Sequence, residues 1–233
     1  MEPTHPGAAG ARAERLERRR DRFGQLLVVL LVVFVLAGVE LGPVVHALSV
    51  VVDLVAVVVA AITTGIPERF RPKLFAGALL AFGTASAVLI AVGGETAEGV
   101  GAILSAVTLA GLLSIVLNRI LNHHDVQMQT IAGAMCAYLL FGMFFGAVYA
   151  AMDLLQTHHA FSHHMGRADY TYFSVTTLTT VGYGDITAVT SLARRLAMIE
   201  AITGQMFLAT AMARLMSVAR FRRRGEEPDT ETG

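Results

Sequence analysis

Six consecutive residues carry the most specific chemistry of this 233-residue chain: Thr180, Val181, Gly182, Tyr183, Gly184 and Asp185. Because glycine adopts positive φ angles without a steric penalty, Gly182 and Gly184 allow consecutive backbone carbonyls to face one axis. Four copies of such a strand form rings of oxygen atoms that replace the hydration shell of a potassium ion. Thr180 adds a hydroxyl oxygen at the inner end, and Tyr183 packs outward to brace the strand. The alternative interpretation is a glycine-rich turn in a membrane protein, which the flanking sequence disfavours.

The composition indicates several membrane spans. Hydrophobic residues make up 55% of the chain and charged residues only 15%, which is too apolar for a soluble domain. The one cysteine, Cys136, lies within an apolar run and reads as a small buried hydrophobe. A disulfide framework or a cysteine-based metal site is therefore not expected.

Six runs are long and apolar enough to cross a bilayer, which takes about 20 residues. They are Phe23–Leu41, Val44–Thr63, Leu74–Val92, Val100–Leu121, Thr130–Leu155 and Leu196–Val218. Gly42-Pro43 divides the first two, and proline suits the first turn of a new helix, so we expect a tight hairpin there. The sequence thus predicts an all-α membrane protein with six transmembrane helices.

The charges predict which side each span faces. Fifteen of the eighteen Lys and Arg residues fall on one side of a six-span chain, and Arg167, Arg194 and Arg195 fall on the other. Because cytoplasmic segments carry an excess of Lys and Arg, both termini are expected in the cytoplasm of a multi-pass protein of the cell membrane.

The segment Gln156–Ser191 is too polar to span a membrane and too apolar near Tyr170–Leu178 for a solvated loop. We expect it to re-enter the membrane as a short helix at Tyr170–Thr179, after which the glycine-containing strand returns outward. Irregular backbone at that depth is tolerated only when it is buried in protein or lines a water-filled path.

From about Thr130 to Phe221 the chain resembles the outer helix, pore helix, selectivity filter and inner helix of tetrameric potassium channels. The resemblance implies that Thr180, Val181, Gly182, Tyr183 and Gly184 form the filter, and that potassium binds at the first four. It implies supporting roles for Thr176, Thr179 and Asp185, and an aromatic cuff made by Tyr172 and Phe173. It also implies that Gly204 is the hinge of the inner helix, since glycine lowers helix propensity by about 1 kcal/mol.

Two positions depart from the pattern of that family. Ala188 stands where proline is common, and Thr176 stands at a pore-helix position where many members have a carboxylate. Glu200 has two open interpretations, because an ionisable group in a membrane helix is costly unless it is paired. It either supports the filter in place of that carboxylate or pairs with Arg194 or Arg195.

The inner helix carries one stripe at helical spacing, formed by Gln205, Leu208, Met212 and Met216. These side chains either line the pore, where Leu and Met close it by dewetting, or make ordinary helix contacts. The fourth span, Val100–Leu121, holds a single basic residue, Arg119. Each charge that crosses the field contributes about 2.3 kcal/mol per 100 mV, so strong voltage gating is not expected.

The outer loop carries His158, His159, His163 and His164. Imidazole titrates near pH 6.5, so proton or zinc modulation is one hypothesis. The alternative is a polar turret without a ligand, because no cysteine or fixed helical spacing supports a closed metal site.

The remaining parts of the chain are a cytoplasmic arm at 1–22, a peripheral four-helix domain at 23–122, a pore domain at 129–221 and a short tail at 222–233. The Arg-rich arm is either a surface helix on anionic lipid or a solvated tail. Asp53, midway along the second span, is expected to make a polar contact, with an ion site as the alternative.

Together these patterns predict a homotetrameric, potassium-selective channel in the lipid bilayer. It is expected to be no enzyme, to need no cofactor besides the permeant K⁺ and to have no nucleic-acid partner. The alternatives are a potassium transporter, which usually shows internal repeats, and a regulatory membrane subunit.

Overall fold

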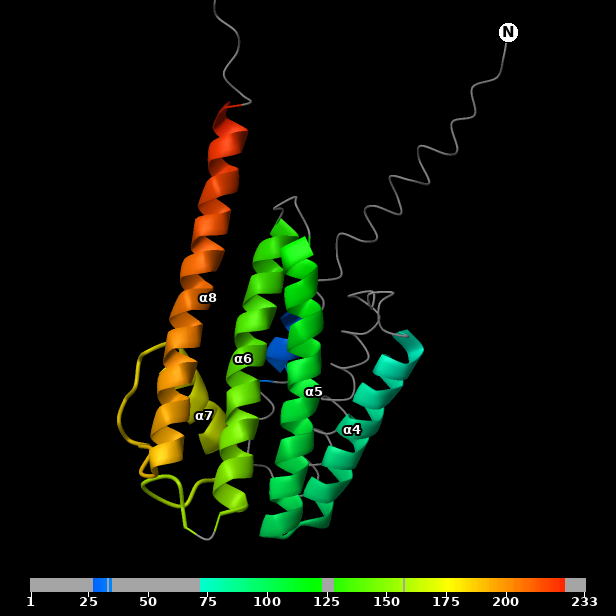
Figure 1. Cartoon of the computed structure of the whole chain (residues 1–233), viewed down its shortest axis with the longest axis vertical. Coiled ribbons are helices and arrows are strands. Elements are labelled where there is room, and N and C mark those ends of the chain that lie inside the picture. The colour runs from blue at the N-terminus through cyan, green and yellow to red at the C-terminus, as the bar shows by residue number, and fades with distance from the viewer. Residues whose placement is uncertain (1–26, 33, 35–71, 123–127, 157, 225–233) are drawn as a thin grey trace, which may run out of the picture.

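The protein is helical in the residues that the computed structural model describes, which are 27–32, 34, 72–122, 128–156 and 158–224. Its helices are α4 (Pro72–Val92), α5 (Glu95–Asn122), α6 (Met128–Leu154), α7 (Arg167–Leu178) and α8 (Ser191–Arg224), after a helical segment at 27–32. Figure 1 shows the long helices running along one axis, with the short α7 packed against α6 and α8. No strand occurs in these ranges, and one isolated antiparallel bridge joins Phe161 to Ala188.

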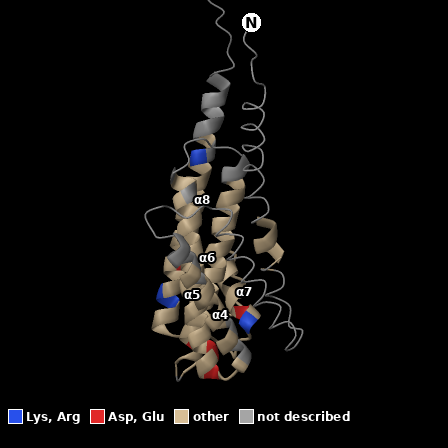
Figure 2. Cartoon of the chain, turned by 90° about the vertical axis from the view of Figure 1, so that its right-hand side faces the viewer, with Lys and Arg blue, Asp and Glu red and all other residues tan. Residues whose placement is uncertain are grey.

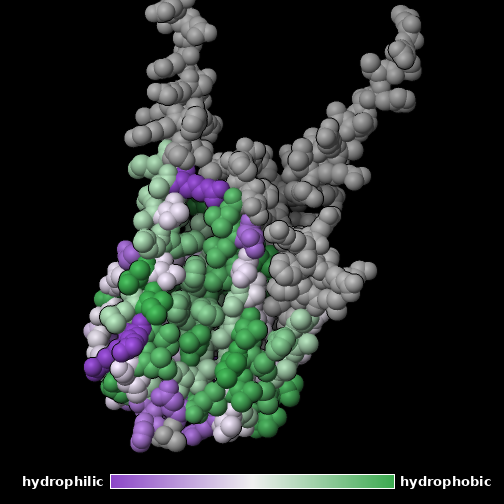
Figure 3. Space-filling view, viewed as in Figure 1, coloured by the Kyte–Doolittle hydropathy of each residue, from purple (hydrophilic) through white to green (hydrophobic). Residues whose placement is uncertain are grey.

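Three stretches of the described helices are long and apolar enough to cross a membrane: Glu95–Asn118, Ile131–Leu154 and Ser191–Arg214. Figure 2 shows few charged residues along the described helices. In Figure 3 hydrophobic residues cover the middle of the visible face, and hydrophilic residues gather toward its ends. The protein is therefore a membrane protein. The expected span Val44–Thr63, most of Phe23–Leu41, and Asp53 lie outside the described residues.

The helices extend beyond the apolar runs that predicted them. α4 and α6 follow the expected Leu74–Val92 and Thr130–Leu155 closely, whereas α5 begins at Glu95 instead of Val100. α8 continues on both sides of the expected Leu196–Val218. An apolar run marks the part of a helix that suits hydrocarbon, but helical hydrogen bonding continues into the polar residues beyond it.

The short helix α7 begins three residues earlier than expected. A local cap explains this difference: the N–H of Gly166 donates to Asp169 Oδ2 at 2.8 Å, and the N–H of Asp169 donates to the Gly166 carbonyl at 3.1 Å. Because this reciprocal pair satisfies donors at the helix start, the helix forms from Arg167 rather than from Tyr170.

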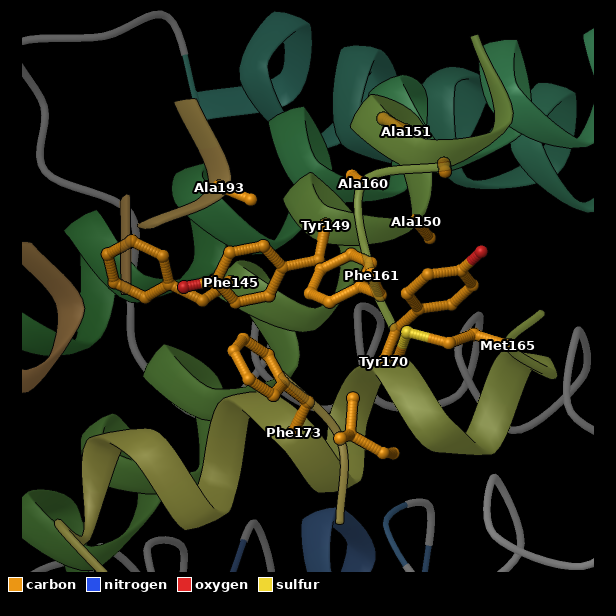
Figure 4. Close-up of a cluster of buried hydrophobic side chains, with 12 residues drawn as sticks. Phe145, Tyr149, Ala150, Ala151, Ala160, Phe161, Met165, Tyr170, Phe173 and Ala193 are labelled. Atoms are coloured by element: carbon orange, nitrogen blue, oxygen red, sulfur yellow. The ribbon is translucent and has the colours of Figure 1, made fainter. Parts of the chain in front are cut away.

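Two hydrophobic clusters hold the described helices together. One joins α5 to α6 and includes Val116, Cys136 and Leu140, so Cys136 is a buried apolar side chain as expected. The other lies between α6, the outer loop and α7, and Figure 4 shows its aromatic rings. The Phe173 ring lies 5.0 Å from the Phe161 ring and 5.1 Å from the Tyr149 ring, both in edge-to-face contact.

Three glycines let α7 approach its neighbours closely. A Cβ at Gly142 would lie 2.9 Å from Val175 Cγ2, and one at Gly146 would lie 3.0 Å from Thr171 Cα. A Cβ at Gly204 on α8 would lie 2.5 Å from the carbonyl oxygen of Leu178. Small residues at membrane-helix contacts allow backbones to pack tightly. The structure thus gives Gly204, within an uninterrupted α8, a packing role that is separate from the hinge role.

α8 is the least buried of the candidate spans, because only 11% of its apolar stretch is covered by the rest of the described chain. Its covered face includes Ala193, Glu200 and Gly204, whereas Met198, Ile202 and Met206 are among its exposed apolar side chains. A single chain therefore leaves most of this helix available to lipid or to other polypeptide.

Replacing Gly204 by alanine is expected to destabilise the protein, because a backbone carbonyl occupies the place of the new Cβ. Overpacking of this kind costs about 1–3 kcal/mol. Thermal unfolding of the purified protein in detergent measures the loss. The control is Gly83→Ala, since a Cβ at Gly83 meets nothing within 4 Å. A G204A melting temperature equal to that of the original protein would contradict the packing role.

Candidate ion-binding strand

The backbone of residues 180–184 alternates in handedness. Thr180, Gly182 and Gly184 have φ angles of +59°, +48° and +80°, and the two residues between them have negative φ. Such alternation turns successive N–H groups to one side of the chain, and the carbonyls then face the other. The positive φ at both glycines agrees with the sequence-based expectation. The same conformation at Thr180 was not expected, because a β-branched residue adopts it only under constraint.

Hydrogen bonds to the end of α7 provide that constraint. The N–H of Thr180 donates to the Thr177 carbonyl at 2.9 Å. The N–H groups of Val181 and Gly182 both donate to the Thr176 carbonyl, at 2.9 and 3.1 Å. In the described part of the chain, no N–H group donates to a carbonyl of residues 180–184. The first three residues of the strand therefore donate their N–H groups to the end of α7, while the strand carbonyls accept no backbone N–H in the described part of the chain.

The electrostatics of α7 also suit a cation at this place. A helix carries partial negative charge at its C-terminal end. α7 ends at Leu178, directly before the strand, and Thr179 closes it by donating its hydroxyl to the Val175 carbonyl at 2.7 Å. Thr176 contributes through its backbone oxygen, while its hydroxyl donates to the Phe173 carbonyl. Both threonines thus shape the turn into the strand.

The outer end of the strand is held by Tyr172. Its hydroxyl donates to Asp185 Oδ2 at 2.8 Å, and its ring stacks on Tyr183 with centroids 6.3 Å apart. The hydrogen bond from Tyr172 is the main cause that lowers the pKa of Asp185. The expected aromatic cuff is wrong for Phe173, which packs into the cluster on another side of α7 because adjacent helical residues point about 100° apart.

The inner end of the strand is tied to both neighbouring helices. Tyr138 on α6 donates its hydroxyl to the Leu178 carbonyl at 3.0 Å, beside the place where Gly204 lets α8 approach. Gln205 Nε2 on α8 lies 3.4 Å from Thr180 Oγ1 and donates to it. The sequence predicted Gln205 as a lining residue, but no pattern pointed to Tyr138.

Glu200 lies behind α7, fully buried with 0% of its surface exposed. Tyr149 donates its hydroxyl to Glu200 Oε2 at 2.6 Å, and Ser174 Oγ lies 2.5 Å from Oε1. Arg194, one of the two arginines that the pairing interpretation considers, instead donates Nε to the Ala188 carbonyl at 2.9 Å. The structure therefore places Glu200 against α7 and α6, and its support of the filter stays a prediction.

The loop between α6 and α7 depends on Asp153, whose role the sequence did not reveal. Its carboxylate accepts the N–H of Ala160 at 2.6 Å and the Tyr170 hydroxyl at 2.7 Å. Burial, together with the bond to Asp153, raises the pKa of Tyr170. This network joins the end of α6 to the loop and to α7. In the sequence, Asp153 looks like any other acidic residue near the end of a membrane span. Only its contacts in the structure reveal its role.

The four histidines of this loop are all exposed. His159 Nδ1 lies 4.0 Å from Asp153 Oδ1, and the ring of His159 meets that of His164 with centroids 5.5 Å apart. Among the described residues, no three His, Cys, Asp or Glu side chains form a group that could hold a metal ion. Through His159, the histidine cluster nevertheless lies close to the buried carboxylate of Asp153.

The predicted stripe on α8 lies on one exposed side of the helix. Gln205, Leu208, Met212 and Met216 are all exposed in the single chain. Near its inner end, Arg214 donates from Nη1 and Nη2 to the carbonyls of Ile120 and Leu121, at 3.0 and 3.2 Å. Because these carbonyls end α5, the arginine complements the negative end of that helix.

Comparison with known families adds one finding to this geometry. Residues 133–220 match a family model described as an ion channel. The match shows that this part of the chain is similar to an ion-channel domain. It extends over most of α6 and α8 and takes in α7, Asp153, the strand and Glu200. No curated protein and no solved structure matches the chain. This similarity points to a channel rather than an enzyme.

Removing the Tyr172 hydroxyl is expected to raise the pKa of Asp185 toward its ordinary value. The bond lowers the pKa of Asp185 in the folded protein, so it stabilises the fold fully when the pH is above the ordinary pKa of aspartate. This stabilisation is lost as the pH falls through the lowered pKa of the folded protein. The Tyr172→Phe variant should therefore lose the ionised form of Asp185 at a higher pH. Carbon-13 NMR of labelled aspartates in nanodiscs measures this.

The matched control is Tyr138→Phe, which removes a hydroxyl bound to the Leu178 carbonyl and not to Asp185. An identical Asp185 titration in Y172F and in the original protein would show that the bond does not control this carboxylate.

Proposed function

We propose that the chain forms a potassium-selective channel in which four copies place their 180–184 strands around one axis. The observation that carries this proposal is the strand itself: its φ angles alternate in sign, its first three N–H groups bind the end of α7, and its carbonyls accept no backbone N–H from the described residues. Carbonyl oxygens in rings replace the hydration shell of K⁺, and Thr180, Val181, Gly182 and Tyr183 would supply them. Asp185, Thr176, Thr179 and Glu200 support this filter.

The fourfold arrangement follows from what one chain leaves incomplete. A single strand supplies one side of a ring, and Val181 and Tyr183 are 53% and 72% exposed in the isolated chain. The stripe on α8 is exposed in the same way. In a tetramer, Gln205, Leu208, Met212 and Met216 would line the path below the filter, and the Met and Leu side chains would close it by dewetting.

The same proposal assigns the remaining elements. α7 is the re-entrant pore helix, α6 and α8 are the outer and inner helices, and Gly204 is the hinge. Both termini are cytoplasmic, and four peripheral helices complete six spans without strong voltage gating. The bonds from Arg214 to the end of α5 support a mechanical link between the inner helix and that peripheral domain.

Purified protein in liposomes is expected to conduct K⁺ or Rb⁺ and to show reversal potentials set by K⁺ in K⁺/Na⁺ mixtures. The matched variant is Gly182→Ala, because an alanine at φ +48° is strained by roughly 1–2 kcal/mol although no atom lies in its way. It should lose selectivity while the oligomer stays intact, and Gly83→Ala should behave as the original protein.

Each competing function gives a different result in the same assay. Equal permeability to Na⁺ would refute potassium selectivity. Uptake that depends on a second ion gradient would instead favour a transporter, and an intact oligomer without flux would favour a regulatory subunit. A steep conductance–voltage curve would contradict the weak voltage dependence.

The histidine cluster is proposed to make conduction respond to external protons. Protonated His159 would form an ion pair with Asp153, which also holds Ala160 and the Tyr170 hydroxyl. Lowering external pH from 7 to about 5.5 should change the current in the original protein, because the ion pair with Asp153 forms only when His159 is protonated. The change should be smaller in His159→Ala, with His158→Ala as control. An identical pH response in H159A would refute the mechanism.

A further inference from the structure

The buried carboxyl of Glu200 joins three helices through a chain of oxygen atoms. From α6 come the Tyr149 hydroxyl, 2.6 Å from Oε2, and the Gly142 carbonyl. From α7 comes Ser174 Oγ, which lies 2.5 Å from Glu200 Oε1 and 2.7 Å from the Gly142 oxygen. Ser174 and Glu200 are both 0% exposed. This set of four groups is called the Glu200 relay below.

Counting protons fixes the direction of every bond in the relay. A hydroxyl has one proton to donate, and a carbonyl can only accept. The Gly142 oxygen must therefore receive the Ser174 proton, which leaves the contact between Ser174 Oγ and Glu200 Oε1 without a donor if Glu200 is ionised. If Glu200 carries a proton on Oε1, three contacts have three protons: Tyr149 to Oε2, Oε1 to Ser174, and Ser174 to Gly142.

Among the residues that the structure describes, no cation forms an ion pair with Glu200 in place of that proton. The titratable groups that face it are hydroxyls of α6, namely Tyr149 and, farther away, Tyr138. From α7 it meets Ser174, and on its own helix Arg194 is exposed and bound to the Ala188 carbonyl. A buried carboxylate without a paired cation is costly, whereas the neutral acid is a hydrogen-bond donor.

We propose that Glu200 works as a neutral carboxylic acid that donates to Ser174 and so positions α7 beneath the ion-binding strand. Ser174 lies two residues before Thr176, whose carbonyl holds the N–H groups of Val181 and Gly182. Loss of the Glu200 proton leaves two oxygen acceptors in contact at Ser174 and pushes α7 away from α8. Glu200, Tyr149 and Ser174 are thus positioning residues; this role rests on the proposed channel function.

The first test is spectroscopic and does not depend on conduction. Infrared spectra of the full-length protein in lipid should show the carbonyl stretch of a buried, protonated carboxylic acid at neutral pH. This band should be absent in Glu200→Gln and shifted in Tyr149→Phe and Ser174→Ala, because each of these two variants removes a hydrogen-bond partner of the Glu200 carboxyl. A neutral-pH spectrum without a Glu200 acid band overturns the proposal.

The second test compares K⁺ flux among variants. The amide of Glu200→Gln can donate to Ser174 and accept from Tyr149, so it should retain most of the flux that Glu200→Ala loses. An unsatisfied buried polar group costs about 1–3 kcal/mol, so flux in E200A should fall by about tenfold or more. Raising the pH should reduce the flux of the original protein and not that of E200Q.

The outcomes separate this proposal from the channel function. If E200Q loses flux as fully as E200A, or keeps the same alkaline decline as the original protein, the donor role is wrong. If the original protein conducts no K⁺ at all, the proposed function fails, and the infrared band still decides the protonation of Glu200. A melting curve for each variant in detergent shows whether a loss of flux reflects unfolding.

Discussion

The structure of α7 and of the strand at 180–184 depends on the hydrogen bonds that bind the start of the strand to the end of α7. Three successive N–H groups, from Thr180 to Gly182, use the carbonyls of Thr176 and Thr177. Backbone groups with a fixed partner hold a fixed direction, so the opposite carbonyls are presented together. These few bonds convert a flexible glycine-containing segment into an ordered row of acceptors.

Several other features near the strand act on the position of α7. Gly142, Gly146 and Gly204 remove the side chains that would hold the helices apart. The aromatic cluster of Figure 4 fills one side of α7, and Tyr172 on another side reaches Tyr183 and Asp185. Since adjacent helical positions point in different directions, one short helix serves both as a core element and as a brace.

Polar contacts inside an apolar protein set the register of these helices. Membrane helices gain little from hydrophobic association with one another, so buried hydrogen bonds specify which faces meet. Asp153 fixes the outer loop to Tyr170, and Glu200 fixes α8 to Ser174 and Tyr149. An unsatisfied polar group at either place is costly, and this cost discourages alternative packings of the same helices.

The sequence by itself determined the helical class, the described spans to within a few residues and the positive φ of Gly182 and Gly184, because apolar run length and glycine are local signals. It also pointed to Glu200, since an ionisable residue in an apolar helix needs a partner. Only the tertiary structure decided which partner, because Tyr149 and Ser174 lie far from Glu200 in the chain. For the same reason, the sequence did not reveal the roles of Tyr138 and Asp153, and it wrongly assigned Phe173 to the aromatic cuff. Thr180 shows the limit most clearly, since its left-handed backbone is imposed by bonds to α7 and not by its own side chain.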